Sequence, residues 1–98
     1  MDRASIISAL RRHEAELRAL GLSRLSLFGS FARGDADERS DIDLLSSLDN
    51  QKNLSLLDVV HIENRLTDLL GRKVDLVPED CLDPRVRPEV QKSLIHAF

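Results

Sequence analysis

Two aspartates lie in a short apolar segment of the sequence, where carboxylates are uncommon. Asp41 and Asp43 flank Ile42 in the segment DIDLL, and strands generally disfavour Asp. Side chains alternate along a strand, so a strand over residues 41–45 places both carboxylates on one face and Ile42 on the other. Two adjacent carboxylates repel each other. A divalent cation relieves this repulsion, because Mg²⁺ prefers carboxylate oxygens. The spacing therefore predicts a metal site.

A third aspartate repeats this pattern further along the chain. Asp75 lies between Val74 and Leu76 in the segment KVDLV. If this segment forms a strand beside residues 41–45, three carboxylates share one face of a sheet. Such a group can hold two metal ions ~3.5–4 Å apart, which activate an attacking oxygen and stabilise a leaving one. We therefore expect Asp41, Asp43 and Asp75 to be catalytic and metal-binding residues.

The dipeptide Gly29-Ser30 predicts an anion site. A glycine lets the backbone come close to a bulky anion. Ser30 can begin a short helix, whose free N–H groups favour phosphate, and its hydroxyl adds a donor. Arg33 lies one turn further on and either contacts the phosphate tail or braces the loop. Together with the aspartates, Gly29, Ser30 and Arg33 predict a site for a magnesium-bound nucleoside triphosphate.

Helices and strands alternate along the chain, and these elements must position the candidate residues. Ser55 is the expected cap of a long helix, Gly71 its end, and Pro78 closes the strand that carries Asp75. The predicted helices span residues 4–20, 30–32, 56–70 and 88–97. The predicted strands span residues 25–28, 41–45 and 73–77, with polar loops over 35–40 and 46–54.

This order predicts the α/β (α+β) class, in which strands and helices pack as layers. We expect a small mixed sheet of three or so strands, with helices packed against one face. A length of 98 residues and a mass of 11.0 kDa fit one domain over residues 1–98. There is no room for a separate substrate domain, so an enzyme of this size must take its acceptor across an open surface.

Composition excludes several classes of protein. The net charge is -3 and aromatic residues make up only 3%, without Trp or Tyr. Direct nucleic-acid binding is therefore not expected, since it usually relies on basic patches and aromatic stacking. The single Cys81 excludes an internal disulfide and indicates a reducing compartment. No apolar run approaches the ~18–20 residues of a membrane span. We expect a cytoplasmic protein that does not enter a membrane.

The motif resembles that of a known superfamily. Gly29-Ser30, ten intervening residues and then Asp41-Ile42-Asp43 is similar to the GSx10DxD signature of the DNA polymerase β-like nucleotidyltransferases. The fuller string GSxARG…SDIDLL, the later KVDLV and the proline-punctuated C-terminal part resemble the minimal nucleotidyltransferase (MNT) branch. The resemblance covers residues 4–98, and no matching position departs from the pattern.

The resemblance implies a polymerase β-like nucleotidyltransferase fold and a specific reaction. MNT antitoxins of HEPN/MNT toxin–antitoxin pairs transfer AMP from ATP to a tyrosine hydroxyl near the active site of the HEPN ribonuclease. By position, Asp41 and Asp43 would hold Mg²⁺, and Asp75 would hold the metal nearer the acceptor hydroxyl and assist its deprotonation. Gly29 and Ser30 would bind the triphosphate. The absence of tyrosine from this sequence agrees with an acceptor on another chain.

Two other functions stay open at this point. The chain can carry out the same chemistry on a small-molecule hydroxyl, as aminoglycoside nucleotidyltransferases do, although those enzymes carry an added helical domain for the acceptor. It can also act as a non-catalytic antitoxin that inhibits its partner by binding alone. The complete set of acids favours catalysis over the second of these.

Overall fold

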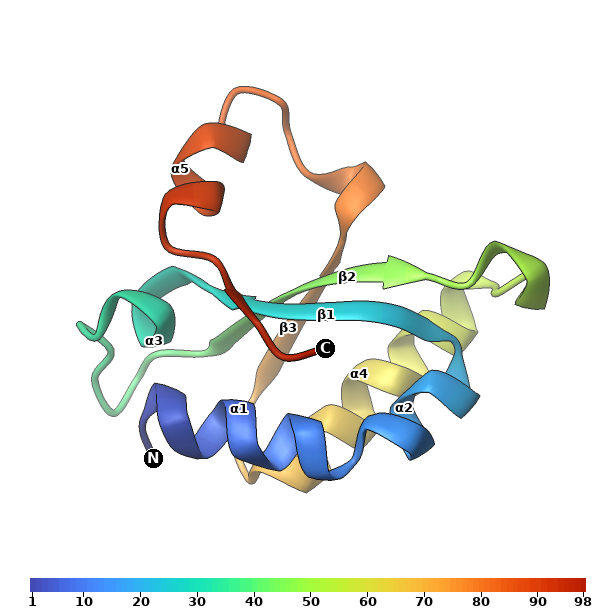
Figure 1. Cartoon of the computed structure of the whole chain (residues 1–98), viewed down its shortest axis with the longest axis horizontal. Helices are drawn as coiled ribbons and strands as arrows, with labels where there is room; N and C mark the ends of the chain where they lie inside the picture. The colour runs from blue at the N-terminus through green and yellow to red at the C-terminus, as the bar shows by residue number, and fades with distance from the viewer.

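A computed structural model describes residues 1–98. Four strands form one sheet in the order β3-β2-β1-β4 (Figure 1). β2 runs antiparallel to β1 and parallel to β3, and β4 runs antiparallel to β1. The sheet is therefore mixed, as expected, with one strand more than the three that the sequence predicts. The strands are β1 (Leu22–Phe28), β2 (Ile42–Leu48), β3 (Val74–Pro78) and β4 (Ile95–His96).

Three helices pack against one face of this sheet. They are α1 (Arg3–Arg12), α2 (Glu14–Leu20) and α4 (Leu56–Leu70), and they lie below the sheet in Figure 1. α5 (Arg87–Lys92) lies above the sheet in Figure 1 and contributes no buried residue. The expected packing of the core helices against one face of the sheet is therefore confirmed. The remaining helical segments are α3 (Gly29–Arg33) and the short 3₁₀ turns η1 (Asn50–Lys52) and η2 (Glu79–Cys81).

The core lies between the sheet and the three helices below it. It contains 17 buried residues, and Leu10, Leu17, Leu27, Leu44 and Leu66 are all fully buried. These leucines come from α1, α2, β1, β2 and α4 in turn, so the burial of apolar surface joins every large element. Burying one such side chain contributes about 1.5–3 kcal/mol. The sheet that carries the aspartates thus rests on a packed layer.

α1 and α2 replace the single helix that the sequence predicts over residues 4–20. The break lies at His13, whose N–H still donates to the carbonyls of Ala9 and Leu10 at 3.3 and 3.2 Å. The apolar spacing does not reveal this break, because Leu10 and Leu17 stay in phase across it and both are buried. His13 itself is half-buried at the bend and lies 3.9 Å from Glu16.

α4 confirms the prediction of a helix over residues 56–70. Ser55 accepts a hydrogen bond from the Asp58 N–H at 3.3 Å, and the Asp58 carboxylate accepts one from the Ser55 N–H at 2.8 Å. This reciprocal pair is a capping box, which satisfies two donors at the helix start. Gly71 ends the helix with a φ of 69°, a left-handed conformation that favours glycine.

The predicted last helix over residues 88–97 is wrong. α5 ends at Lys92, and the chain then forms β4 beside β1. The Ala97 N–H donates to the Leu25 carbonyl at 2.9 Å, and the Leu25 N–H donates to the Phe98 carbonyl at 3.2 Å. Local apolar spacing is compatible with a helix here. The free edge of β1 offers backbone partners that this spacing does not show.

β2 is longer than the predicted strand over residues 41–45. It begins at Ile42 and continues to Leu48, so the predicted loop over 46–54 begins too early. Ser46 and Ser47 look like loop residues because they are polar. Ser46 is nevertheless buried, and its hydroxyl donates to the Val77 carbonyl at 3.3 Å. Pairing with β1 and β3 decides the strand here.

Side chains close both outer edges of the sheet. On β3, the Leu76 N–H donates to Glu63 Oε2 at 2.9 Å and the Val74 N–H donates to Thr67 Oγ1 at 3.2 Å, both from α4. At the other edge, Arg11 Nε donates to the Ala97 carbonyl at 3.0 Å. An unpaired edge is a template for pairing with another chain, and these contacts remove most of that opportunity.

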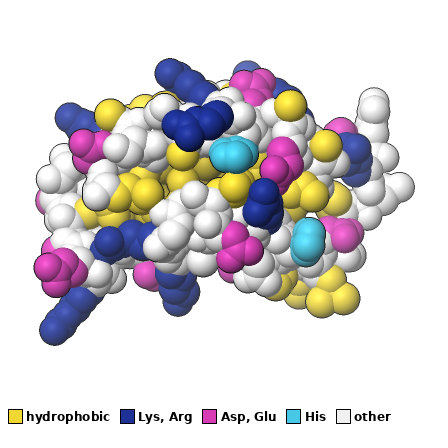
Figure 2. Space-filling model, turned by 90° about the horizontal axis from the view of Figure 1, so that it is seen from below, with side chains coloured by type: hydrophobic (Ala, Val, Ile, Leu, Met, Phe, Trp, Pro, Cys, Tyr) yellow, Lys and Arg dark blue, Asp and Glu magenta, His cyan; other side chains and the backbone are white.

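The helical face is polar at its rim and apolar along its middle. Figure 2 shows this face from below, with a band of hydrophobic side chains flanked by charged ones. Leu56, Leu57 and Val60, in the first turns of α4, are among the large apolar side chains that remain exposed. No helix of the structure has the length and apolar character needed to cross a membrane.

Candidate active site

Asp43 and Asp75 are direct neighbours on the sheet. They occupy the same register position of the parallel pair β2–β3, between the buried pairs Ile42–Val74 and Leu44–Leu76. Because side chains alternate along strands, both carboxylates point away from the helical core. Asp43 is half-buried and Asp75 is exposed. The adjacency predicted from the sequence is therefore confirmed, and the apolar neighbours fix its orientation.

Asp41 completes the acidic group at the start of β2. It lies one residue before the strand rather than within it, and its side chain is exposed. Lys73 Nζ lies 3.9 Å from Asp41 Oδ2, an exposed and weak pair. The Ile42 N–H donates to the Lys73 carbonyl at 2.9 Å, which fixes the starts of β2 and β3 against each other.

Gly29 brings the backbone against the Asp43 carboxylate. The last residue of β1, Phe28, pairs with Asp43, so α3 begins directly beside it. Gly29 has a φ of 76°, and a Cβ built on it would collide with Asp43 Oδ2. Only glycine adopts this positive φ without strain and also leaves space for the Asp43 side chain. The sequence suggested that this glycine makes room for phosphate, and the structure shows that it also makes room for the Asp43 carboxylate.

The electrostatics of the site centre on Asp43. Burial raises the pKa of this carboxyl above its ordinary value of 3.8, and the charges of Asp75 and Asp41 raise it further. Arg33 offsets part of the rise. The repulsion that Asp43 experiences from the two neighbouring carboxylates is relieved by a cation or by a proton. The site therefore favours binding of positive charge.

Ser30 and Arg33 lie on α3, next to this group. Ser30 is half-buried near the start of α3, and its carbonyl accepts the N–H groups of Gly34 and Asp35, both at 3.0 Å. Gly34 ends α3 in a left-handed conformation. Arg33 Nε donates to Asp35 Oδ2 at 3.2 Å. In this arrangement Arg33 braces the loop, one of the two roles considered from the sequence.

The donor set fits Mg²⁺ in chemistry, although the side chains alone do not form a cage. No three His, Cys, Asp or Glu side chains are gathered closely enough to hold a metal ion by themselves. Mg²⁺ commonly takes one or two carboxylates and fills its other positions with water and substrate phosphate. The raised pKa of Asp43, which lies beside two further carboxylates, agrees with a site that gains its cation together with a nucleotide.

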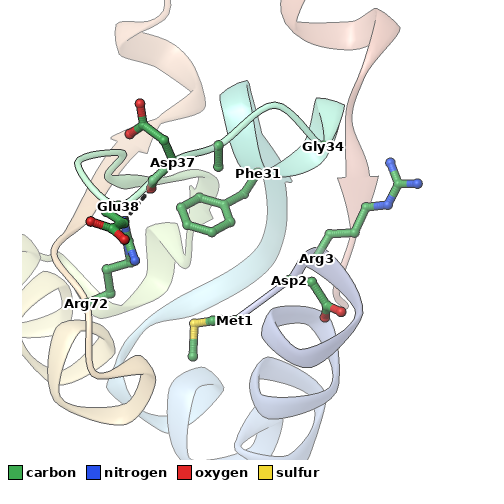
Figure 3. A pocket seen from close by; sticks show the side chains of 9 residues that line it. Met1, Asp2, Arg3, Phe31, Gly34, Asp37, Glu38 and Arg72 are labelled. Carbon is green, nitrogen blue, oxygen red and sulfur yellow. Dashed lines mark hydrogen bonds between the residues drawn. The ribbon is translucent and has the colours of Figure 1, made fainter.

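One contact near the site was not foreseen from the sequence. Arg72, two residues after the end of α4, donates to the backbone carbonyls of Ser40 and Asp37 and lies over the ring of Phe31. Arg72, Phe31 and Asp37 border a pocket of about 450 Å³ that opens beside α3 (Figure 3). Neither Asp43 nor Asp75 lines this pocket, so it is distinct from the acidic group. No motif marks Arg72, because its partners are backbone atoms distant in sequence.

Comparison with known proteins places this geometry in a family. The sequence model of the nucleotidyltransferase domain matches residues 10–96. The chain is 37% identical over 92 residues to the protein adenylyltransferase MntA of Thermococcus cleftensis, covering 93% of this chain and 91% of that protein. A relative of similar identity, a provisionally assigned protein adenylyltransferase of Methanocaldococcus jannaschii, is covered over 95% of both chains.

Solved structures share the fold. A provisionally assigned minimal nucleotidyltransferase superposes with a TM-score of 0.72 at 36% identity, covering 97% of this chain and 95% of that one. A toxin–antitoxin complex with AMP-PNP gives 0.71 at 22% identity over 90% and 72% of the chains. A tri-AMPylated HEPN toxin of Shewanella oneidensis with its MNT antitoxin gives 0.66 at 19% identity, over 94% and 71%. The chain therefore belongs to the nucleotidyltransferase domain family and is a nucleotidyltransferase.

Proposed function

We propose that this nucleotidyltransferase is an Mg²⁺-dependent antitoxin that transfers AMP from ATP to a tyrosine hydroxyl of a partner HEPN ribonuclease. The observation that carries the proposal is the pairing of Asp43 with Asp75 beside Gly29. This arrangement puts acidic groups and a closely approachable backbone at one end of the sheet. An exposed Asp75 leaves room for an acceptor that arrives from another protein.

The relatives support the proposed donor and partner. MntA of Thermococcus cleftensis is a protein adenylyltransferase, which favours a protein acceptor over a small molecule. A toxin–antitoxin complex of the same fold holds AMP-PNP, an ATP analogue. In another complex of this fold the HEPN toxin carries AMP groups in the presence of its MNT antitoxin. These proteins motivate the assignment of ATP as donor and of a HEPN toxin as acceptor.

Each site residue has a role in this proposal. Asp41 and Asp43 would hold Mg²⁺, with Asp75 as a further ligand. When bound, the metal supplies charge neutralisation at the phosphates and activation of the acceptor oxygen. Gly29 and Ser30 lie against the triphosphate, and Arg33 would exchange its partner Asp35 for a phosphate oxygen. The ion pair between Arg33 and Asp35 is exposed, so little stability is lost in that exchange.

The transfer itself is a substitution at phosphorus. The tyrosine oxygen forms a bond to the α-phosphorus of ATP, and the bond from this phosphorus to its bridging oxygen breaks, which releases pyrophosphate. The hydroxyl proton leaves towards Asp75, an exposed carboxylate of the acidic group. The site acts mainly by positioning and electrostatics, as is usual in phosphoryl-type transfer.

The experiment is to incubate the purified chain with Mg-ATP and a HEPN protein, taken from the neighbouring reading frame where that frame encodes one. Intact mass spectrometry should show AMP added to the partner, and peptide mapping should place it on tyrosine. The variant Asp43→Asn and a sample with EDTA serve as controls and should show no transfer. Transfer that persists in either control would overturn the assignment of the acids and the metal.

The same variants separate catalysis from simple binding in cells. With wild-type antitoxin, cells that express the HEPN toxin should survive. If Asp43→Asn protects them equally well at equal expression, protection comes from binding alone and the proposed enzymatic role is wrong. If purified protein modifies an aminoglycoside but never the HEPN protein, the acceptor is a small molecule.

A further inference from the structure

Arg72 joins the three segments that carry the residues of the proposed site. It follows Gly71, at the end of α4, and lies three residues before Asp75. Its half-buried side chain extends between α3 and the loop that precedes β2 (Figure 3). Sequence motifs give this residue no role. Its contacts show what it can do.

Two of these contacts hold the turn that leads into Asp41. Arg72 Nε donates to the Ser40 carbonyl at 2.7 Å, and Nη2 donates to the Asp37 carbonyl at 2.6 Å. Asp37 and Ser40 are also the two ends of one turn, since the Ser40 N–H donates to the Asp37 carbonyl at 3.2 Å. A planar guanidinium suits two acceptors in fixed positions. Because Asp41 follows Ser40 directly, this clamp fixes the start of β2.

The third contact reaches the segment that carries the proposed phosphate site. Arg72 Cζ lies 5.1 Å from the centroid of the Phe31 ring, within the ~6 Å range of a cation–π contact. Phe31 is buried and follows Ser30 directly. One side chain therefore links α3, the 37–40 turn and the start of β3.

We propose that Arg72 is a positioning residue for the transfer reaction. It holds Asp41 and Asp43 in fixed relation to Ser30 and Asp75 and does not itself touch the nucleotide. The inference rests on the proposed function. A misplacement of reacting groups by about 1 Å can cost about 10²-fold in rate, so loss of this clamp should lower turnover more than it lowers ATP binding.

The test compares Arg72→Met with Arg65→Met. Methionine keeps much of the chain length and removes the donors. Arg65 is a matched control, because it is also half-buried and makes two hydrogen bonds, to Glu16 at 2.6 and 3.1 Å. It joins α4 to α2, away from the acids. Thermal melting, kcat and the KM for ATP are measured for both variants and for Arg72→Lys.

We expect Arg72→Met to lower kcat by roughly 10–100-fold, with a change of less than about threefold in the KM for ATP. Arg72→Lys can reach only one carbonyl at a time, so it should recover part of the loss. Arg65→Met should keep kcat within about twofold even if it melts at an equal or lower temperature. Wild-type kcat in Arg72→Met, or an equal loss in Arg65→Met, would overturn the inference.

A spectroscopic measurement separates this inference from the proposed function. In ¹⁵N NMR spectra of the protein without nucleotide, Arg72→Met should shift the amide signals of Asp41, Asp43 and Ser30. Arg65→Met should leave these signals in place. If the wild-type chain transfers no AMP, the proposed function fails while the NMR result still decides the positioning role. Unshifted signals in Arg72→Met would refute that role whatever the activity.

Discussion

At the scale of single residues, Asp43 is the group whose chemistry the fold alters most clearly. Burial and the charges of Asp75 and Asp41 raise the pKa of its carboxyl above 3.8. The folded chain therefore binds this proton more tightly than the unfolded chain does. The resulting stability is fully present below the unfolded pKa and is lost as the pH rises through the folded pKa.

This pH dependence of stability leads to a prediction for the melting temperature of Asp43→Asn in the absence of metal. At about pH 7.5 the variant should melt at a higher temperature than wild type, because it lacks the repelled charge. As the pH falls through the raised pKa, wild-type Asp43 takes up a proton, and the two melting temperatures should converge. Asp80→Asn, at an exposed position of η2, is the control and should show no such pH-dependent gain. A constant difference at every pH would contradict the electrostatic cause.

Magnesium should reverse that order of stability. A ligand that binds only the folded state raises its stability by mass action. Mg²⁺ with a non-hydrolysable ATP analogue should therefore raise the melting temperature of wild type more than that of Asp43→Asn. The measurement is a melting curve against Mg²⁺ concentration at fixed analogue. An equal rise in both proteins would show that Asp43 takes no part in holding the metal.

Gly29 should be less replaceable than Ser30. Gly29→Ala forces an L side chain into a left-handed conformation and against Asp43 Oδ2, so it should disturb the Asp43 carboxylate as well as the proposed binding of phosphate. Ser30→Ala removes one neutral hydroxyl, whose contact is worth about 0.5–1.5 kcal/mol. Calorimetry with Mg²⁺ and the ATP analogue should therefore show the larger loss of affinity for Gly29→Ala. The reverse ranking would place the critical contact at Ser30.

At the scale of elements, the caps of α4 are the clearest link between local sequence and structure. Ser55→Ala removes one half of the capping box with Asp58, which should cost about 1 kcal/mol. For a domain of this size that is a fall of roughly 4–8 °C in melting temperature. Ser8→Ala, at an exposed position inside α1, is the control and should not destabilise. Transfer activity should persist in both variants, since neither residue is near the acids.

β4 is the element that most separates the structure from the sequence-based expectation. Ala97 directly follows β4 and is buried, with 5% of its surface exposed. Ala97→Asp buries a carboxylate beside the core, and a charge without a partner there is costly. We expect a fall of at least about 10 °C in melting temperature. Gln91→Asp, on the exposed side of α5, should change it little. Equal tolerance of both would indicate that residues 95–98 do not pair with β1.

At the scale of the whole molecule, the residues that stabilise the fold and the residues of the candidate site lie on opposite faces of the sheet. One face rests on α1, α2 and α4 and holds most of the buried apolar surface, while the other presents the acids at one end of β2 and β3. Side chains from α1 and α4 close the edges. A substitution such as Asp43→Asn can therefore remove function without removing the core, and the proposed reaction can be tested on folded variants.

The sequence by itself determined the family and much of the scaffold of the candidate site. Alternation around Asp43 and Asp75 placed their carboxylates opposite the core, and the signals at Ser55 and Gly71 bounded α4. These features depend on neighbours within a few residues, where side-chain direction and backbone preference act directly. The spacing of Gly29-Ser30 and the aspartates indicates the nucleotidyltransferase family.

Only the tertiary structure decided the features that depend on distant partners. The break at His13, the extension of β2 through Ser46 and the strand at Ile95–His96 follow from packing on, or pairing with, the sheet. The clamp of Arg72 on the carbonyls of Asp37 and Ser40 has no sequence signal, because any residue supplies a carbonyl. Local pattern fixes where a side chain points. Which backbone groups it meets depends on how the strands and helices are brought together.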